Sequence, residues 1–308
     1  MSALLLDVVA IDDAVPGIRT LTLARPDREP LPSFTPGSHL VIEYDGGANA
    51  YSLTGETAAP REYAVSVLEC PDGRGGSRWI HRLSVGDTVA VREPRSAFPP
   101  VLRASRHLLI AAGIGITPMV SHLRSARRWG RDVQLLYIHR EGRGAYVDEI
   151  KALTDHAGFF TDRAAFLAEL TATLADSPFG THGYICGPGL FIDDVVALAV
   201  DLGWPPSRIH VEHFGGELAP GEPFEVELAS SGDTFVVESG VSLLEALEAH
   251  GRTVPSMCRQ GVCGECRVPV RAGTVLHRDL YLSQAERDAG DAIMACVSRA
   301  AGRLEVDL

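Results

Sequence analysis

The chain has 308 residues, of which 45% are apolar and 22% charged, and its formal net charge is −12 with a pI of about 5.4. This composition is typical of a globular protein and excludes extended disorder. The length suits two or three domains, and the negative charge argues against nucleic acid or an anionic membrane as partner. Apolar runs such as residues 107–116 fall short of the roughly 18 residues that a membrane-spanning helix needs.

The first part of the chain shows short strands at close spacing. Residues 1–15 have no basic segment and soon become acidic, which predicts a first strand rather than a signal peptide. Alternating runs at 39–44 and 62–69 follow, separated by turn sequences rich in glycine and proline. This pattern is typical of a small antiparallel β-barrel, which we predict over residues 1–101.

A different rhythm begins near residue 103. Apolar strands at 107–113, 132–139 and 182–187 alternate with helical stretches such as 118–130. Strands that alternate with helices predict a parallel sheet covered by helices. We therefore assign residues 102–216 to an α/β domain.

The last part of the chain begins after a linker rich in glycine and proline, predicted at 217–223. A hairpin is expected over 224–239 and a helix over 242–251, which ends in glycine. We assign residues 224–308 to a third, α+β domain, so that the predicted fold class is multidomain.

Three of the six cysteines lie within the nine residues "CRQGVCGEC" (258–266), and a fourth follows after 29 intervening residues. C-x4-C-x2-C with a distant cysteine is the spacing of plant-type [2Fe–2S] binding. Four thiolates must converge on two irons, and Gly261 and Gly264 allow a close backbone. The sequence therefore predicts these cluster ligands: Cys258, Cys263, Cys266 and Cys296.

Other roles for the cysteines fit less well. Structural zinc usually takes two C-x2-C pairs, and this chain has one. No C-x-H occurs, which excludes a Rieske centre within the chain. Cys70 lies in the predicted barrel and is expected to be a half-buried packing residue. Few, clustered cysteines do not form a disulfide framework, so we expect a reduced, cytoplasmic protein.

Two glycine-rich turns follow predicted strands of the α/β domain. In "AAGIGITPM" (111–119), Gly113 and Gly115 permit a tight turn, and we expect Thr117 to cap the next helix with Pro118 first inside it. An ordinary βα turn would explain this motif equally well. In "YICGPG" a second strand ends in the same way, and both ends would line one crevice of a doubly wound sheet.

The predicted barrel contains two further motifs. "NAYSLTG" (49–55) places Tyr51 beside hydroxyl groups that can bind a flat heteroaromatic ring. "DGRGGSRWIHRL" (72–83) is a glycine-rich turn with Ser77 near the start of a helix, as in phosphate sites. From the residues alone, a core position is the simpler interpretation of Tyr51.

In this order, "NAYSL", "GRGGS", "AAGIGITPM", "YICGPG" and "CRQGVCGEC" resemble the phthalate dioxygenase reductase family, which includes vanillate demethylase reductases. The resemblance covers essentially the whole chain. It implies an N-terminal FMN domain, a central NADH domain and a C-terminal ferredoxin domain with a [2Fe–2S] cluster. In this family a ferredoxin domain placed last implies FMN rather than FAD.

The resemblance also implies roles for single residues. The flavin is expected to contact Asn49, Ala50, Tyr51, Ser52, Gly75, Gly76 and Ser77. The nicotinamide nucleotide is expected to contact Gly113, Gly115, Thr117, Cys186, Gly187 and Pro188. The catalytic positions beside the reacting rings would be Ser52, Thr117, Cys186 and Phe214.

One position departs from the family motif, which usually has arginine where this chain has Asn49. A cation for the flavin phosphate would then come from Arg74, Arg78 or Arg95, and the sequence does not choose among them. Among the histidines, His39 can line the flavin pocket. No histidine is needed for catalysis, because hydride transfer requires no acid–base pair.

The parts suggest an order of electron transfer. NAD(P)H gives two electrons as a hydride and a [2Fe–2S] cluster accepts one, so a flavin must lie between them. The resemblance implies that the electrons then pass to a separate Rieske-type oxygenase, with Met257, Arg259 and Gln260 as the docking face. It also implies NADH, although Arg140 and Arg143 can hold the 2′-phosphate of NADPH.

Two alternatives stay open. A reductase that serves a cytochrome P450 or another acceptor would share every motif. A non-enzymatic [2Fe–2S] redox sensor would need the cluster but neither flavin nor nucleotide.

Overall fold

The computed structural model describes residues 4–44, 47–71, 73, 75–96, 98–214, 221–256, 259, 261, 263–279 and 281–308. The chain divides into two compact units, one of Met1–Tyr44 with Tyr51–Phe214 and the other of Asp45–Ala50 with Gly215–Leu308. In chain order the elements up to the middle are β1 (Leu4–Asp12), β2 (Ile18–Ala24), β3 (Ser38–Tyr44), β4 (Gly47–Ser52), β5 (Glu62–Leu68), α1 (Gly76–Ile80), β6 (Thr88–Val91), β7 (Arg95–Ser96), β8 (Arg106–Ala112), the 3₁₀ turn η1 (Gly113–Gly115), α2 (Ile116–Trp129), β9 (Val133–Ile138) and α3 (Val147–Leu153).

The remaining elements are β10 (Ala157–Phe160), α4 (Arg163–Ala175), β11 (Thr181–Gly187), α5 (Gly189–Asp201), η2 (Pro206–Arg208), β12 (Ile209–His213), β13 (Phe224–Leu228), β14 (Thr234–Val237), α6 (Leu243–Ala249), β15 (Arg267–Leu276), α7 (Gln284–Ala289), β16 (Ala292–Met294) and β17 (Arg299–Val306). Among the described residues, every helix is too short or too polar to cross a bilayer.

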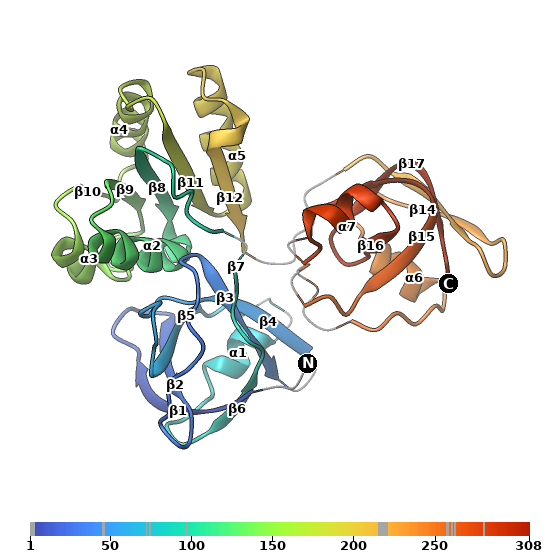
Figure 1. Ribbon diagram of the computed structural model, residues 1–308, viewed down its shortest axis with the longest axis horizontal. Helices are drawn as coiled ribbons and strands as arrows, with labels where there is room; N and C mark the ends of the chain where they lie inside the picture. Colours follow the sequence, from blue (N-terminus) through green and yellow to red (C-terminus); the bar gives the residue numbers. More distant parts are fainter. Residues whose placement is uncertain are drawn as a thin grey trace. The chain divides into compact units, whose positions relative to one another are not determined.

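The N-terminal sheet is antiparallel, with the strand order β4–β3–β6–β1–β2–β5 and with β7 paired to β3 (Figure 1). Alternation sends one side of each strand inward, as in β1, where Leu6 and Val8 are buried while Leu5 is exposed. A single bridge between Leu53 and Val65 joins the end of β4 to β5. The antiparallel sheet is confirmed, and its closure into a barrel stays a prediction.

The central sheet is parallel, with the order β10–β9–β8–β11–β12 (Figure 1). Neighbouring residues of β8 face opposite sides of it. Leu109 packs with buried residues of α2 and α3, and Leu108 packs with those of α4 and α5. The predicted α/β arrangement is confirmed, because helices cover both faces of the parallel strands.

Polar contacts join the antiparallel sheet to the α/β part of the same unit. The Tyr146 hydroxyl lies 2.5 Å from Ser66 Oγ and donates to Thr54 Oγ1 at 3.1 Å. The Gly37 N–H donates to Ser121 Oγ on α2 at 3.0 Å. A Cβ added at Gly37 would lie 2.1 Å from the Phe98 carbonyl oxygen, so only glycine permits this approach.

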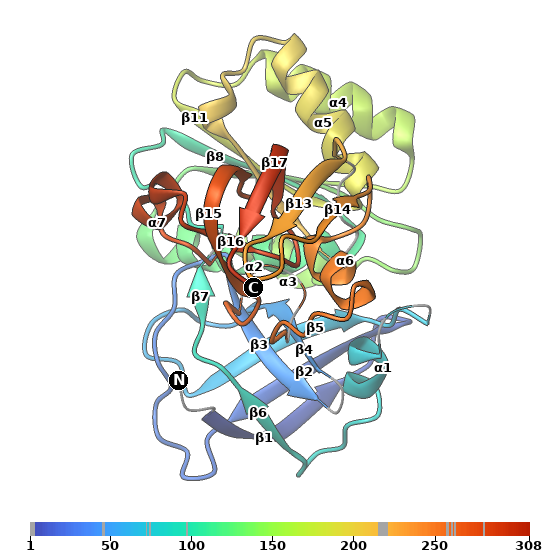
Figure 2. The same ribbon diagram turned by 90° about the vertical axis from the view of Figure 1, so that its right-hand side faces the viewer.

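The C-terminal unit contains a mixed sheet in the order β14–β13–β17–β15–β16, and Figure 2 shows β15, β17, β13 and β14 side by side. β13 and β14 form the predicted hairpin, and β13 also pairs in parallel with β17. The predicted helix is confirmed as α6, which begins with a capping box between Ser242 and Glu245. Its buried leucines pack into the core of the unit.

We predict that Gly37→Ala lowers the free energy of unfolding by about 2–4 kcal/mol, because left-handed strain adds to overpacking. Gly37 has φ +74° and meets the Phe98 backbone. Gly130, with φ +61° and no atom near its added Cβ, is the matched control, and Gly130→Ala should cost only about 1 kcal/mol. Urea unfolding measures both, and equal losses would contradict the close contact.

Candidate functional site

The two predicted glycine turns of the α/β domain meet at the carboxyl ends of β8 and β11. Gly113 opens the 3₁₀ turn η1 with φ +55°. Gly115 packs directly on the end of β11, because an added Cβ would lie 2.3 Å from the Cys186 carbonyl oxygen and 2.7 Å from the Gly187 nitrogen. The structure thus brings both turns to one edge of the sheet, where open α/β sheets bind ligands.

The predicted role of Thr117 as helix cap is wrong. The helix α2 begins at Ile116 and its N-cap is Gly115. The Thr117 hydroxyl instead donates to the Ile114 carbonyl at 3.0 Å. The preceding 3₁₀ turn already has helical geometry, so the helix starts before Thr117 and Pro118 lies inside its first turn.

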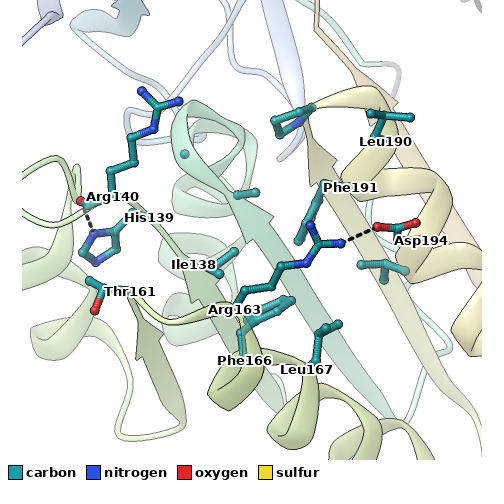
Figure 3. Close-up of a pocket in the computed structure, with 14 residues that line it drawn as sticks. Ile138, His139, Arg140, Thr161, Arg163, Phe166, Leu167, Leu190, Phe191 and Asp194 are labelled. Carbon is teal, nitrogen blue, oxygen red and sulfur yellow. Dashed lines mark hydrogen bonds and ion pairs between the residues drawn. The ribbon is translucent and has the colours of Figure 1, made fainter.

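A pocket of about 520 Å³ lies beside this crevice (Figure 3). It is formed by the ends of β8 and β9, the segment after β10 and the first turns of α4 and α5. Its lining residues are Ala112, Gly113, Ile138, His139, Arg140, Thr161, Arg163, Phe166, Leu167, Pro188, Leu190, Phe191, Asp194 and Val195. The lining is largely apolar with a few polar groups, which is typical of cofactor sites.

The lining of the pocket includes the charged side chains of Arg140, Arg163 and Asp194. Arg163 donates to Asp194 at 2.8 Å, and Figure 3 shows this ion pair between α4 and α5. Arg140, one of the two predicted phosphate-binding arginines, contributes to the lining, whereas Arg143 is not among the lining residues. Sequence reasoning did not identify Arg163 or Asp194, because no motif links α4 to α5.

Glu212 is a functional candidate that sequence reasoning missed. It pairs with Cys186 across β11 and β12, and both side chains are buried. Burial raises the pKa of Glu212 to about 8. Burial, together with the Glu212 charge, raises the pKa of the Cys186 thiol.

The alternation of β12 makes this carboxyl unusual. Val211 is 39% exposed while Glu212 beside it is 7% exposed, the reverse of an ordinary edge strand. Glu212 Oε2 is buried and has no hydrogen-bond partner within the described chain. A buried polar atom without a partner is costly unless a ligand satisfies it. Phe214, which follows at the end of β12, is 39% exposed.

In the part of the chain that the structure describes, two more buried polar atoms near the predicted flavin strand β4 lack a hydrogen-bond partner. Ser52 Oγ is buried without a hydrogen-bond partner in the described residues, and so is His39 Nε2 on the neighbouring strand β3. Burial, aided by the charge of Arg95, lowers the pKa of His39 to about 4, so that its ring is neutral. These atoms fit an occupant that carries ring nitrogens and carbonyl oxygens, as a flavin does.

The other residues with a predicted flavin contact lie on β4 and at the start of α1. Tyr51 packs against the core of the antiparallel sheet, and Asn49 and Ala50 precede it on β4. In the phosphate turn, Gly75 has φ +106° with open space beside it. The Ser77 hydroxyl accepts from the Cys70 N–H at 3.1 Å, so the backbone already uses it.

Two arginines and one cysteine of this turn were also predicted from the sequence. Arg74 lies outside the described residues. The Arg78 guanidinium donates to the Gly73 carbonyl at 3.5 Å. Cys70 is exposed rather than half-buried, because it lies beyond the end of β5.

The predicted cluster ligands lie in the C-terminal unit. Cys263, Cys266 and Cys296 are buried, and a hydrogen bond with Cys296 lowers the pKa of the Cys266 thiol. Cys258 lies outside the described residues, as do Met257 and Gln260 of the predicted docking face. The described residues alone contain no group of three potential ligands arranged around a metal. The buried thiols nevertheless fit the sulfur ligation that iron–sulfur clusters require.

Two family descriptions match the chain. "2Fe-2S iron-sulfur cluster binding domain" matches residues 226–301. "Dimethylamine monooxygenase subunit DmmA-like, N-terminal domain" matches residues 88–209.

Whole-chain relatives extend these matches. The heme-dependent oxidative N-demethylase beta subunit of Ectopseudomonas mendocina (strain ymp) is 42% identical over 98% of both chains. A solved phthalate dioxygenase reductase, titled a modular structure for electron transfer from pyridine nucleotides to [2Fe–2S], is 33% identical with a TM-score of 0.71 over 99% of this chain and 98% of that one. An intact type IV self-sufficient cytochrome P450 monooxygenase is 34% identical with a TM-score of 0.78 over 99% of this chain, which spans only 41% of that protein.

We predict a pH-dependent contribution of Glu212 to stability. Its pKa of about 8 in the folded chain exceeds the ordinary 4.5, so its contribution is fully present below about pH 4.5 and is lost as the pH rises to about 8. Glutamine mimics the protonated carboxyl. The free energy of unfolding of the wild type relative to Glu212→Gln should therefore fall between about pH 5 and pH 8, by at most about 1.4 kcal/mol per pH unit.

Urea unfolding at several pH values measures this difference. The exposed Glu141→Gln is the matched control. A wild-type stability that stays parallel to that of Glu212→Gln across the range would contradict the buried, protonated carboxyl.

Proposed function

Because the chain belongs to the phthalate dioxygenase reductase family of oxidoreductases, we propose that it passes electrons from NADH through FMN to a [2Fe–2S] cluster and on to a separate oxygenase. The observation that carries the proposal is the match along the whole chain to a reductase of this kind. The crevice lies at the edge of the parallel sheet, Ser52 ends β4 of the antiparallel sheet, and the buried cysteines lie in the segments before β15 and after β16. We assign FMN to residues 1–101, NADH to 102–216 and the cluster to 224–308, with 217–223 as linker.

The nucleotide would lie along the edge of the parallel sheet. The pocket between α4 and α5 is large and apolar enough for the adenosine half. The turn at Gly113 leaves room for the diphosphate, because Gly113 has open space beside it, and Pro188 lines the same pocket. The nicotinamide, which supplies the hydride, would then reach the buried pair Cys186 and Glu212.

Cys186 and Glu212 would orient the nicotinamide rather than exchange protons with it. The neutral carboxyl of Glu212 can donate to a carboxamide oxygen or accept from its nitrogen, which satisfies the buried Oε2. The neutral Cys186 thiol gives a small, weakly polar wall. Thr117 is buried and would hold the turn in place through its hydrogen bond to the Ile114 carbonyl.

FMN would occupy the antiparallel sheet, where it supplies hydride acceptance and release of single electrons. The Ser52 hydroxyl would donate to a ring heteroatom, and neutral His39 can complete the polar lining. Gly75, which has open space beside it and precedes Gly76 at the start of α1, would leave room for the phosphate. Arg95, which lies close enough to influence His39, is one cation that can replace the arginine missing at Asn49.

The four cysteines would hold the cluster: Cys258, Cys263, Cys266 and Cys296. The acceptor beyond it would be a separate protein, since relatives are subunits of oxygenase systems. A Rieske-type oxygenase is the acceptor that the family resemblance implies. We propose a cytoplasmic location for the pair.

An oxygenase that contains heme is the second candidate acceptor. A relative with 42% identity is the beta subunit of a heme-dependent oxidative N-demethylase, and a self-sufficient P450 monooxygenase contains a similar segment in its own chain. Both acceptors take electrons singly, so the reductase chemistry would be the same.

Reconstitution separates the two acceptors. The purified chain is mixed with a Rieske-type oxygenase or with the heme component of an oxidative N-demethylase, and NADH oxidation coupled to product is measured. Coupled turnover with one component supports that acceptor. If NADH is oxidised but neither oxygenase component forms product, at equal component concentrations, the result would contradict an oxygenase reductase of these types.

We predict that Ser52→Ala separates flavin chemistry from folding. The Ser52 hydroxyl makes no hydrogen bond in the described residues, so its loss should leave the unfolding free energy of the flavin-free chain unchanged or raise it by about 1 kcal/mol. Flavin reduction by NADH in stopped flow should slow by about tenfold or more. Thr20→Val, which removes a hydroxyl bonded to Ser66, is the control and should cost stability without slowing hydride transfer.

We also predict that Asp194→Asn relaxes the preference for NADH. Asp194 neutralises Arg163 at the pocket, and its removal frees this cation for a 2′-phosphate. The ratio of kcat/KM for NADPH to that for NADH should rise about two- to fivefold, as expected for an exposed ion pair. Asp201→Asn, at the far end of α5, is the control. An equal rise in both variants would contradict a local effect at the pocket.

A further inference from the structure

The cysteine loop packs against one short segment, which we call the strap and define as residues 277–279 and 281–282. Gly261, inside the cysteine motif, has φ +73°, and an added Cβ would lie 2.6 Å from Val297 Cγ2 and 3.0 Å from Asp279 Cα. Gly264 has φ +83°, and an added Cβ would lie 2.2 Å from the Tyr281 ring. Both glycines between the ligand cysteines therefore need their hydrogen side chain, because their φ is positive and because the strap, together with Val297 at Gly261, lies against them.

Asp279 organises the strap from the inside. Its side chain is fully buried, and its Oδ2 accepts from the N–H groups of Tyr281 at 3.2 Å and Leu282 at 2.8 Å. Its Oδ1 accepts from the Ser298 hydroxyl at 3.1 Å and lies 3.3 Å from His277 Nδ1. A buried carboxylate with this many partners holds a turn in one conformation.

Ser298 ties the strap to the last ligand. Its oxygen accepts from the Arg278 N–H at 3.1 Å while its hydroxyl donates to Asp279. It lies two residues after Cys296 and is fully buried. The Arg287 guanidinium also donates to the Asp279 carbonyl, which fixes the strap on the side of α7.

We propose that Asp279 is a positioning residue of the [2Fe–2S] site, which shapes the cysteine loop through the strap and lowers the reduction potential of the cluster. The inference rests on the proposed function and concerns a residue that ligates no iron. Asp279 acts in two ways with the same sign. Its charge opposes the gain of an electron nearby, and the strap that it holds keeps water from the loop.

The test compares Asp279→Asn with Asp288→Asn, which removes an equal charge from an exposed position on α7. Iron and acid-labile sulfide per chain, the EPR spectrum and the cluster potential are measured on the whole protein. In Asp279→Asn the potential should become more positive and the visible cluster bands should disappear in air about tenfold faster or more, the usual effect of losing an outer group of a metal site. Asp288→Asn should match the wild type in both.

Ser298→Ala covers the case in which Asp279→Asn does not fold. It removes one hydrogen bond to Asp279 and keeps the charge, so it should shorten the cluster lifetime in the same direction by a smaller factor. Equal potentials and lifetimes in all variants that fold would overturn the inference. A wild type that binds no cluster would instead overturn the proposed function, and flavin reduction by NADH, measured separately, should be unchanged by every variant.

Discussion

A hydride moves two electrons at once, whereas a [2Fe–2S] cluster takes one, and this mismatch is the constraint on which the chain is built. A single small site cannot bind a dinucleotide, a flavin and a cluster, because each requires a different backbone geometry. The chain accordingly has an antiparallel sheet, a parallel sheet and a mixed sheet. Hydride transfer needs orientation more than acid–base groups, which agrees with a crevice formed mainly by glycines and buried neutral side chains.

Three of the buried polar atoms that have no partner among the described residues lie where ligands are expected, whereas those of His122, His277, Arg287 and Arg299 lie elsewhere. Ser52 Oγ and His39 Nε2 lie on neighbouring strands of the antiparallel sheet, and Glu212 Oε2 lies at the end of the parallel one. By contrast, the buried carboxylate of Asp279 has a full set of hydrogen bonds. An unsatisfied group fits direct contact with a ligand, and a satisfied one fits support of the loop that holds it.

Much of the fold could be predicted from local patterns. Alternation and apolar runs identified β3, β5, β8, β9 and β11, because strand burial repeats along the chain. The cap of α2 could not be predicted, since the 3₁₀ turn before it depends on the packing of Gly115 against β11. Closure of the first sheet depends on pairings between distant strands, which no local pattern records.

Residues of the candidate site could be predicted where they belong to a contiguous sequence motif, and the others could not. The cysteine spacing and the glycine turns are contiguous in sequence, so their residues could be named. Glu212 sits in an ordinary-looking strand, and its burial follows from the pairing with Cys186. Arg163, Asp194 and Asp279 reach their sites only through tertiary packing, and no spacing rule connects them to a ligand.

The most direct test of the account is an anaerobic titration of the purified chain with NADH, followed in the visible range and by EPR, with the released flavin identified. The account predicts FMN in the extract, bleaching of flavin and iron–sulfur bands by NADH, and the EPR signal of a reduced [2Fe–2S] cluster. A cluster that stays oxidised while NADH is present, or a protein that binds no flavin, would contradict electron transfer through this chain.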